Sequence, residues 1–165
     1  MKKWTFVLAL LVIALVSCKS MKEGKDTTES LDFEVIQSGV LMGAGAEGIE
    51  QSLVVCNSEA ELNEIKEKMN SVNYSTEALD KMNVDFEKET IIGYFDAVRS
   101  SGGYALDANY LKRIKTKEET KLVMSYTLTS PQGAATMALT QPYHFIKTEK
   151  IEGNVELIVE GTDSL

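Results

Sequence analysis

The side chains that most often carry catalysis are scarce in this 165-residue sequence. His144 is the single histidine and there are two cysteines, so a histidine-based triad or general base would have to use His144. Alternation along Gln141–Ile146 would place His144 on one strand face with Pro142 and Ile146, and no cysteine, serine or acid beside it completes a recognisable set. We therefore expect no catalytic residue, no metal site and no cofactor.

A glycine-rich segment has the spacing of a nucleotide-binding loop without its context. Gly43, Gly45 and Gly48 fit the pattern Gly-x-Gly-x-x-Gly, in which the backbone approaches a pyrophosphate where a helix begins. Here residues 49–55 continue as a strand pattern and Glu47 would repel phosphate, so we interpret the segment as a loop. The formal net charge of −8, from 17 basic and 25 acidic residues, also argues against nucleic-acid binding.

A second glycine-rich segment, Arg99–Tyr104, is the strongest candidate for recognition. Its adjacent glycines permit a left-handed turn or the close approach of another chain, and its Arg and Tyr are common anchors of protein interfaces. The segment is either a tight turn or bulge, or a recognition loop. We pair it with the segment Thr140–His144, in which Pro142 suggests a sheet edge or a bulge. The predicted partner-binding residues are Arg99, Ser101, Gly102, Gly103, Tyr104, Thr140, Pro142 and Tyr143.

The first residues of the chain indicate export and lipid attachment. Two lysines precede an apolar run from Trp4 to Val16, which at about 1.5 Å per residue is too short to cross a bilayer comfortably. The run ends in Leu15-Val16-Ser17-Cys18, which resembles the bacterial lipobox. That resemblance implies that residues 1–17 are a lipoprotein signal peptide and that Cys18 is acylated after cleavage. Two or three acyl chains would hold the protein firmly on a membrane.

The residues that follow Cys18 read as a spacer between lipid and domain. Residues 18–30 are polar and without periodicity, which predicts a flexible tether. Cleavage would leave 15 basic and 25 acidic residues, a net charge of −10, so anionic lipid should repel the mature surface. Lys19, rather than an aspartate, follows the lipidated cysteine, and this favours the outer membrane as the location.

The remaining residues, 31–165, form one predicted domain that is rich in strands. Ser58 and Glu61 make a capping box that opens a helix ending near Asn70, and a shorter helix is expected from Thr76 to Met82. Strands are expected at Leu31–Gln37, Ser52–Cys56, Thr90–Val98, Tyr104–Ile114, Lys121–Thr129, Ala135–Thr148 and Asn154–Glu160. Strands in series predict an α+β fold: a mainly antiparallel, curved sheet, half-open barrel or sandwich with one main helix.

Several motifs, taken in order, resemble the PrcB C-terminal domain family. They are Val84-Asp85-Phe86 before Ile91-Ile92-Gly93-Tyr94-Phe95, then Ser101-Gly102-Gly103-Tyr104, Ser130-Pro131, and Ala138-Leu139-Thr140-Gln141-Pro142-Tyr143-His144. The resemblance covers residues 84–148. It implies a non-catalytic lipoprotein that associates with, or stabilises, an exported protease, and it supplies no catalytic residues.

Two functions follow as hypotheses. The first is a membrane-anchored interaction module whose partner surface is the Arg99–Tyr104 loop with the Thr140–His144 strand. The alternative is a small-ligand-binding lipoprotein with a deep apolar cavity lined by Tyr104, Met124 and Tyr126. For the second cysteine, Cys56, which follows an apolar strand pattern, we expect a buried and inert thiol.

Overall fold

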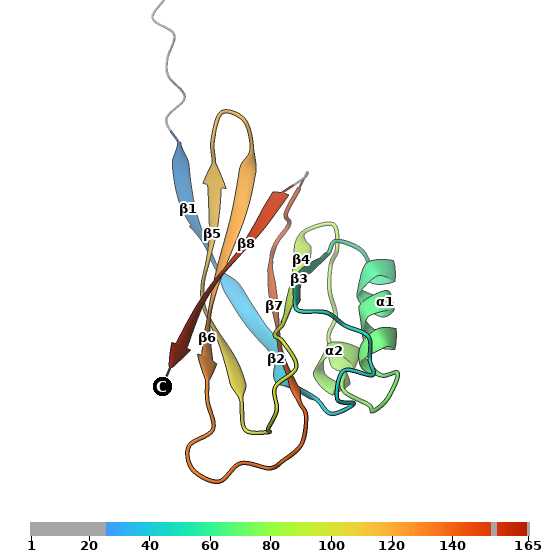
Figure 1. Ribbon diagram of the computed structural model, residues 1–165. Coiled ribbons are helices and arrows are strands. Elements are labelled where there is room, and N and C mark those ends of the chain that lie inside the picture. The colour runs from blue at the N-terminus through green and yellow to red at the C-terminus, as the bar shows by residue number, and fades with distance from the viewer. Residues whose placement is uncertain (1–25, 153–154, 165) are drawn as a thin grey trace, which may run out of the picture.

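Two β-sheets face one another, and two helices cover the far side of one of them (Figure 1). The structure is a computed structural model that describes residues 26–152 and 155–164. Its strands are β1 (Thr27–Leu31), β2 (Phe33–Leu41), β3 (Ser52–Cys56), β4 (Glu89–Phe95), β5 (Ala105–Lys115), β6 (Thr120–Thr129), β7 (Gln141–Glu149) and β8 (Val155–Ser164), and its helices are α1 (Glu59–Met69) and α2 (Glu77–Lys81). The predicted α+β fold is confirmed.

The chain joins the two sheets along one side and leaves the other side open. The first sheet has the order β1-β5-β6-β8 and the second β2-β7-β4-β3. Only Asp32 separates β1 from β2, so the chain passes from one sheet to the other at that residue. The strand pairs are antiparallel except that β8 runs parallel to β6. The result is a half-open sandwich.

The core is divided into two layers by the second sheet. Between the sheets, Tyr94 stacks on Tyr126 with ring centroids 4.7 Å apart. On the helix side, Phe145 covers Gly93, its register partner on β4. A Cβ atom added to Gly93 would lie 2.4 Å from the Phe145 ring, so this strand position requires glycine.

Helix α1 begins where the sequence predicts. The N–H of Glu61 donates to the side chain of Ser58, and the Glu61 carboxylate accepts from the N–H of Asn57 at 2.7 Å. The Asn57 bond is the main reason why the pKa of Glu61 is lowered. These contacts satisfy N–H groups that a helix start leaves without partners.

The predicted tether is corrected at its C-terminal end. Residues Thr27 to Ser30 belong to β1, which pairs with β5, and Glu29 contacts its register partner Arg113 at 3.2 Å. A polar sequence can form this strand because β1 is an edge strand and buries only Leu31. Residues 1–17 and Cys18 lie outside the described residues, so the signal peptide and the lipid site stay predictions. In the described ranges, no helix is long and apolar enough to cross a membrane.

The predicted strand Ala135–Thr148 is also shorter than expected. Strand β7 begins only at Gln141, and residues 130–140 form a loop. Pro142 was expected at an edge or a bulge, but β7 lies inside its sheet between β2 and β4. The proline is tolerated because it is the second residue of the strand, where a missing N–H costs little. Its carbonyl still accepts from the N–H of Asp96 at 2.9 Å.

Candidate interaction site at the loop end

The two segments that the sequence paired as a partner surface lie side by side. The N–H of Arg99 donates to the Thr140 carbonyl at 2.7 Å, and the N–H of Thr140 donates back to the Arg99 carbonyl at 3.1 Å. The Thr140 hydroxyl also donates to the carbonyl of Ser101 at 2.9 Å. The connection between β4 and β5 is therefore bound to the connection between β6 and β7, at the lower end of the molecule in Figure 1.

Gly102 and Gly103 are explained by close packing between these two loops. The N–H of Gly102 donates to the carbonyl of Thr136 at 3.0 Å. A Cβ atom on Gly102 would lie 2.3 Å from the Thr136 hydroxyl, and one on Gly103, where φ is +87°, would lie 2.8 Å from Pro131. The glycines thus serve the tight-turn role that the sequence left as one of two alternatives.

Arg99 is held by a buried carboxylate. Asp96 is almost fully buried, and its carboxylate accepts from Nε and Nη2 of Arg99 at 2.6 and 2.9 Å. The guanidinium also lies 5.5 Å from the ring centre of Tyr104, a cation–π distance. Because Asp96 neutralises it, Arg99 fixes the loop rather than offering an anion-binding charge.

Two glutamines connect this loop with the glycine-rich loop that precedes β3. The Gln141 side-chain amide donates to the carbonyls of Ile49 and Asp96, both at 2.9 Å. The Gln51 amide donates to the Tyr94 hydroxyl at 2.8 Å. Sequence reasoning missed Asp96, Gln51 and Gln141, because each acts through a contact with a residue far away in the chain.

The strands and turns that carry this site match one known family. Residues 90–149 match the family model described as PrcB C-terminal. The resemblance drawn from the motifs is therefore confirmed, and the PrcB C-terminal segment spans β4 to β7 with both loops of the site. No curated protein and no solved structure matches the chain.

Four predicted partner-binding residues of the PrcB C-terminal segment are buried, which corrects their assignment. They are Gly102, Thr140, Pro142 and Tyr143. Tyr143 faces the helices, where its hydroxyl donates to the carbonyl of Ser75 at 2.8 Å and burial raises its pKa. These residues hold the loops in place. The exposed part of the predicted surface is confined to the loops themselves.

The single histidine lies between the sheets. His144 is 2% exposed, and its Nδ1 is 2.8 Å from the Leu106 carbonyl, to which it donates. Its Nε2 is buried without a hydrogen-bond partner among the described residues. Burial lowers the pKa of His144, because the charged imidazolium is poorly solvated there. This position matches the expected strand face shared with Ile146 and offers no access for a substrate.

The other reactive groups are equally enclosed. Cys56 is buried, and burial raises the pKa of its thiol to about 12, so the expected inert thiol is found. In the described part of the chain, no group of three or more His, Cys, Asp or Glu side chains is arranged to hold a metal ion.

In the part of the chain that the structure describes, the residues expected to line an apolar cavity pack against one another. Tyr126 stacks on Tyr94, and its hydroxyl donates to the sulfur of Met124 at 2.9 Å, so two of the three predicted lining residues lie in packed core. The third, Tyr104, is partly buried and packs against the same cluster. A cavity of about 200 Å³ opens beside the Asp96–Arg99 pair, and Tyr126 is one of its lining residues. Drug-sized ligands generally occupy about 300 to 1,000 Å³.

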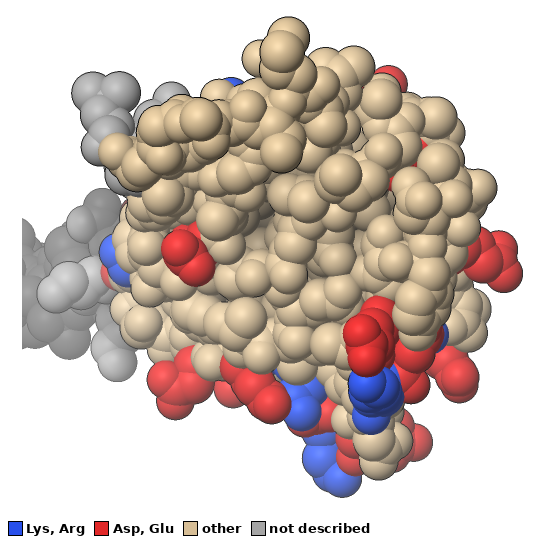
Figure 2. Space-filling model, turned by 90° about the horizontal axis from the view of Figure 1, so that it is seen from below, with Lys and Arg blue, Asp and Glu red and all other residues tan. Residues whose placement is uncertain are grey.

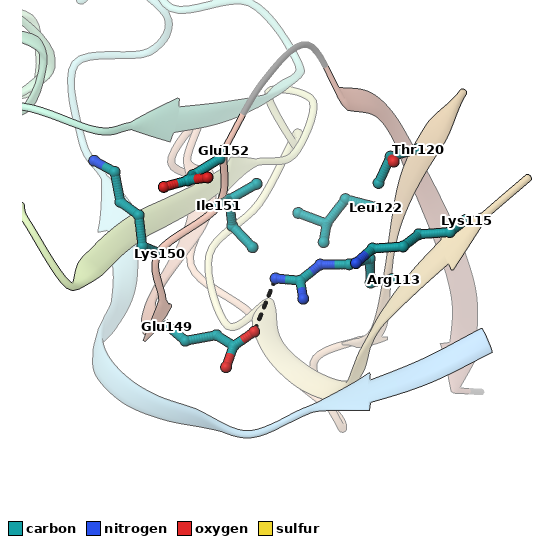
Figure 3. A pocket seen from close by; sticks show the side chains of 8 residues that line it. All are labelled: Arg113, Lys115, Thr120, Leu122, Glu149, Lys150, Ile151 and Glu152. Carbon is teal, nitrogen blue, oxygen red and sulfur yellow. Dashed lines mark hydrogen bonds and ion pairs between the residues drawn. The ribbon is translucent and has the colours of Figure 1, made fainter. Parts of the chain in front are cut away.

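A cavity of about 290 Å³ at the opposite end is lined by several charges that already have partners (Figure 3). Arg113 points into it toward Glu149, at 2.8 Å, and also contacts Glu29. Lys150 points away from it, toward the carbonyls of Phe86 and Asn57. These pairings leave little unbalanced charge to attract an ionic ligand.

Proposed function

We propose that the protein is a bacterial lipoprotein that is anchored through Cys18 and acts as an interaction module for an exported protease.

 The PrcB C-terminal segment supports the association with a protease, and the lipobox at Leu15-Val16-Ser17-Cys18 supports the anchor. The module is non-catalytic, and its location is the outer membrane.

The observation that carries this proposal is the arrangement of the two ends of the domain. Thr27 pairs with Lys115 at one end of β5, whereas Ala105, at the other end of β5, follows the Arg99–Tyr104 loop. Ten residue steps of a strand span about 33 Å. In Figure 1, the start of β1 and the loop end lie at opposite ends of the first sheet. A lipid on Cys18 would join the chain on the side of Thr27, which would direct the loop end away from the membrane and toward other proteins.

The anchor is tested with the full chain expressed in its own cells. We expect fatty-acid labelling and recovery in the membrane fraction for the natural chain, and loss of both for Cys18→Ala. Cys56→Ala is the matched control, because Cys56 is the other cysteine and is buried in the domain. Equal labelling of Cys18→Ala and the natural chain would refute the anchor.

The protease association is tested separately. Exported proteases that co-purify with the natural chain in mild detergent are identified by mass spectrometry, and their abundance is then followed in cells that lack this protein. We expect one protease to be recovered and to decrease in the deletion strain. A chain that purifies without any protease would overturn the association and leave the lipid anchor standing.

A further inference from the structure

Large apolar side chains are exposed where three loops meet. Met42, Val98, Met137 and Leu139 are between 41% and 100% exposed, and Met137 is the most exposed of them. The loops touch: a Cβ atom on Gly45 would lie 3.3 Å from Val98, and Val98 precedes the Arg99–Thr140 bridge. We call the surface formed by residues 42–48, 97–103 and 130–140 the loop face.

The loop face carries very little charge in a protein that is otherwise acidic. Residues 122–146 and 39–46 contain no Lys, Arg, Asp or Glu. Neither of the two ionisable groups within the face presents an unpaired charge at the surface. Arg99 is bound to Asp96. Glu47 is buried: one carboxylate oxygen accepts from the N–H of Gly43 at 2.8 Å, and the other has no hydrogen-bond partner among the described residues. Figure 2, seen from below, shows uncharged residues over most of this end, with charged ones gathered mainly along one margin.

The geometry points to the loop face as the docking surface for an uncharged, apolar surface of a second exported protein. This inference rests on the proposed interaction function and specifies the chemistry of the partner's contact. An interface core is typically depleted of charge and rich in side chains such as Met. Charged groups on the partner would lose water there without gaining an opposite charge.

A membrane is a less suitable binding partner for the loop face than a protein. Peripheral proteins that insert apolar loops add Lys and Arg around them to bind anionic lipid, whereas the loop face has no unneutralised basic residue among its described residues. Nine residue steps separate Cys18 from Thr27, about 32 Å when fully extended. That reach is only about the length of β5, so the loop face would meet the anchoring membrane only if the chain doubled back completely.

A second copy of this chain is also a poorer occupant. A symmetric contact through two loop faces would direct the two Thr27 ends in opposite directions. Two copies anchored in the same membrane leaflet could not both keep their anchors and form this contact. A different protein has no such restriction.

The loop face is organised before it binds. Two contacts hold the 130–140 loop on either side of Met137: the Gly102–Thr136 hydrogen bond and the Thr140–Ser101 hydrogen bond. The side chain between them is free to pack, and methionine adapts to irregular surfaces. Anchoring the loop in advance reduces the ordering cost of association.

The test combines crosslinking with charge insertion in the full, membrane-anchored chain. A photoreactive amino acid replaces Met137, and the crosslinked product is sized and identified by mass spectrometry. We expect a conjugate with one exported protein. We also expect Met137→Asp combined with Leu139→Asp to reduce co-purification of that protein at least tenfold, since burying an apolar side chain contributes about 1.5 kcal/mol or more.

Val35→Asp is the matched control, because Val35 is 52% exposed, close to Leu139 at 48%, but lies on β2 away from the loop face. It should leave recovery of the partner unchanged, and thermal unfolding should confirm that each variant is folded. A conjugate of twice the chain's mass, crosslinking to lipid only, or unchanged recovery with the double variant would each overturn the inference. If the identified partner is not a protease, the docking surface stands and the proposed protease association fails.

Discussion

The Asp96–Arg99 pair offers the sharpest test of how the loop end is held together. Asp96 has a side chain that is 4% exposed, and Arg99 one that is 32% exposed. Removing the partner of a buried charge costs about 3 to 5 kcal/mol, but a charge that can turn toward water costs less. We therefore expect Arg99→Met, which strands the buried carboxylate, to lower the free energy of unfolding by about 3 kcal/mol. Asp96→Asn should lower it by about 2 kcal/mol.

The two substitutions should not be additive, because they remove the same interaction. In the double variant Asp96→Asn/Arg99→Met, the loss should be smaller than the sum of the two single losses by at least about 1 kcal/mol. Urea unfolding followed by circular dichroism measures all four free energies. Lys68→Met is the control, because Lys68 pairs with Glu64 on the exposed side of α1, and it should cost about 0.5 kcal/mol or less.

Two results would refute this reasoning. If the single losses add, the pair is not coupled and the loop is held by its backbone contacts alone. If Asp96→Asn costs more than Arg99→Met, burial of the carboxylate is not the dominant effect. The same variants should also weaken partner recovery, since Arg99 carries the backbone bridge to Thr140.

Three further outcomes follow from the packing. Burial lowers the pKa of His144 in the folded protein, whereas in the unfolded chain the pKa has its ordinary value of 6.5. As the pH falls below that value, the unfolded state binds more protons than the folded state, so the free energy of unfolding should decrease from about pH 7 to pH 5. His144→Gln should flatten this pH dependence, as urea unfolding would measure. Gly93→Ala should destabilise the protein by about 2 kcal/mol or more in thermal unfolding, because its Cβ would lie 2.4 Å from the Phe145 ring. Native Cys56, whose pKa is about 12, should resist iodoacetamide at pH 8 and react after unfolding, as mass spectrometry would show.

Some helices and strands could be predicted from sequence patterns within the element itself. Strand β3 and helix α1 have nearly the predicted bounds, because an apolar run defines the strand and a capping box opens the helix. Strand β1 was missed because an edge strand that buries one side chain has a polar sequence. Its partner strand β5 is also far away in the chain, since Thr27 pairs with Lys115. The segment 135–140 resembles a strand in composition, but its hydrogen bonds go to the neighbouring loop instead.

The candidate site shows a more general reason for the difference between sequence and structure. The sequence predicted a partner surface from glycine, proline and arginine, because these residues are unusual in a strand-rich chain. In the structure the backbone needs them: Gly102 and Gly103 allow two loops to touch, and Arg99 fastens one of them to Asp96. The surface left for a partner consists of common apolar residues such as Met137 and Leu139. Nothing about these residue types in the sequence indicates a binding site. Their exposure depends on the contacts that hold the loops together, such as the Asp96–Arg99 pair. A substitution that breaks these buried contacts should therefore abolish binding as effectively as a substitution on the loop face itself.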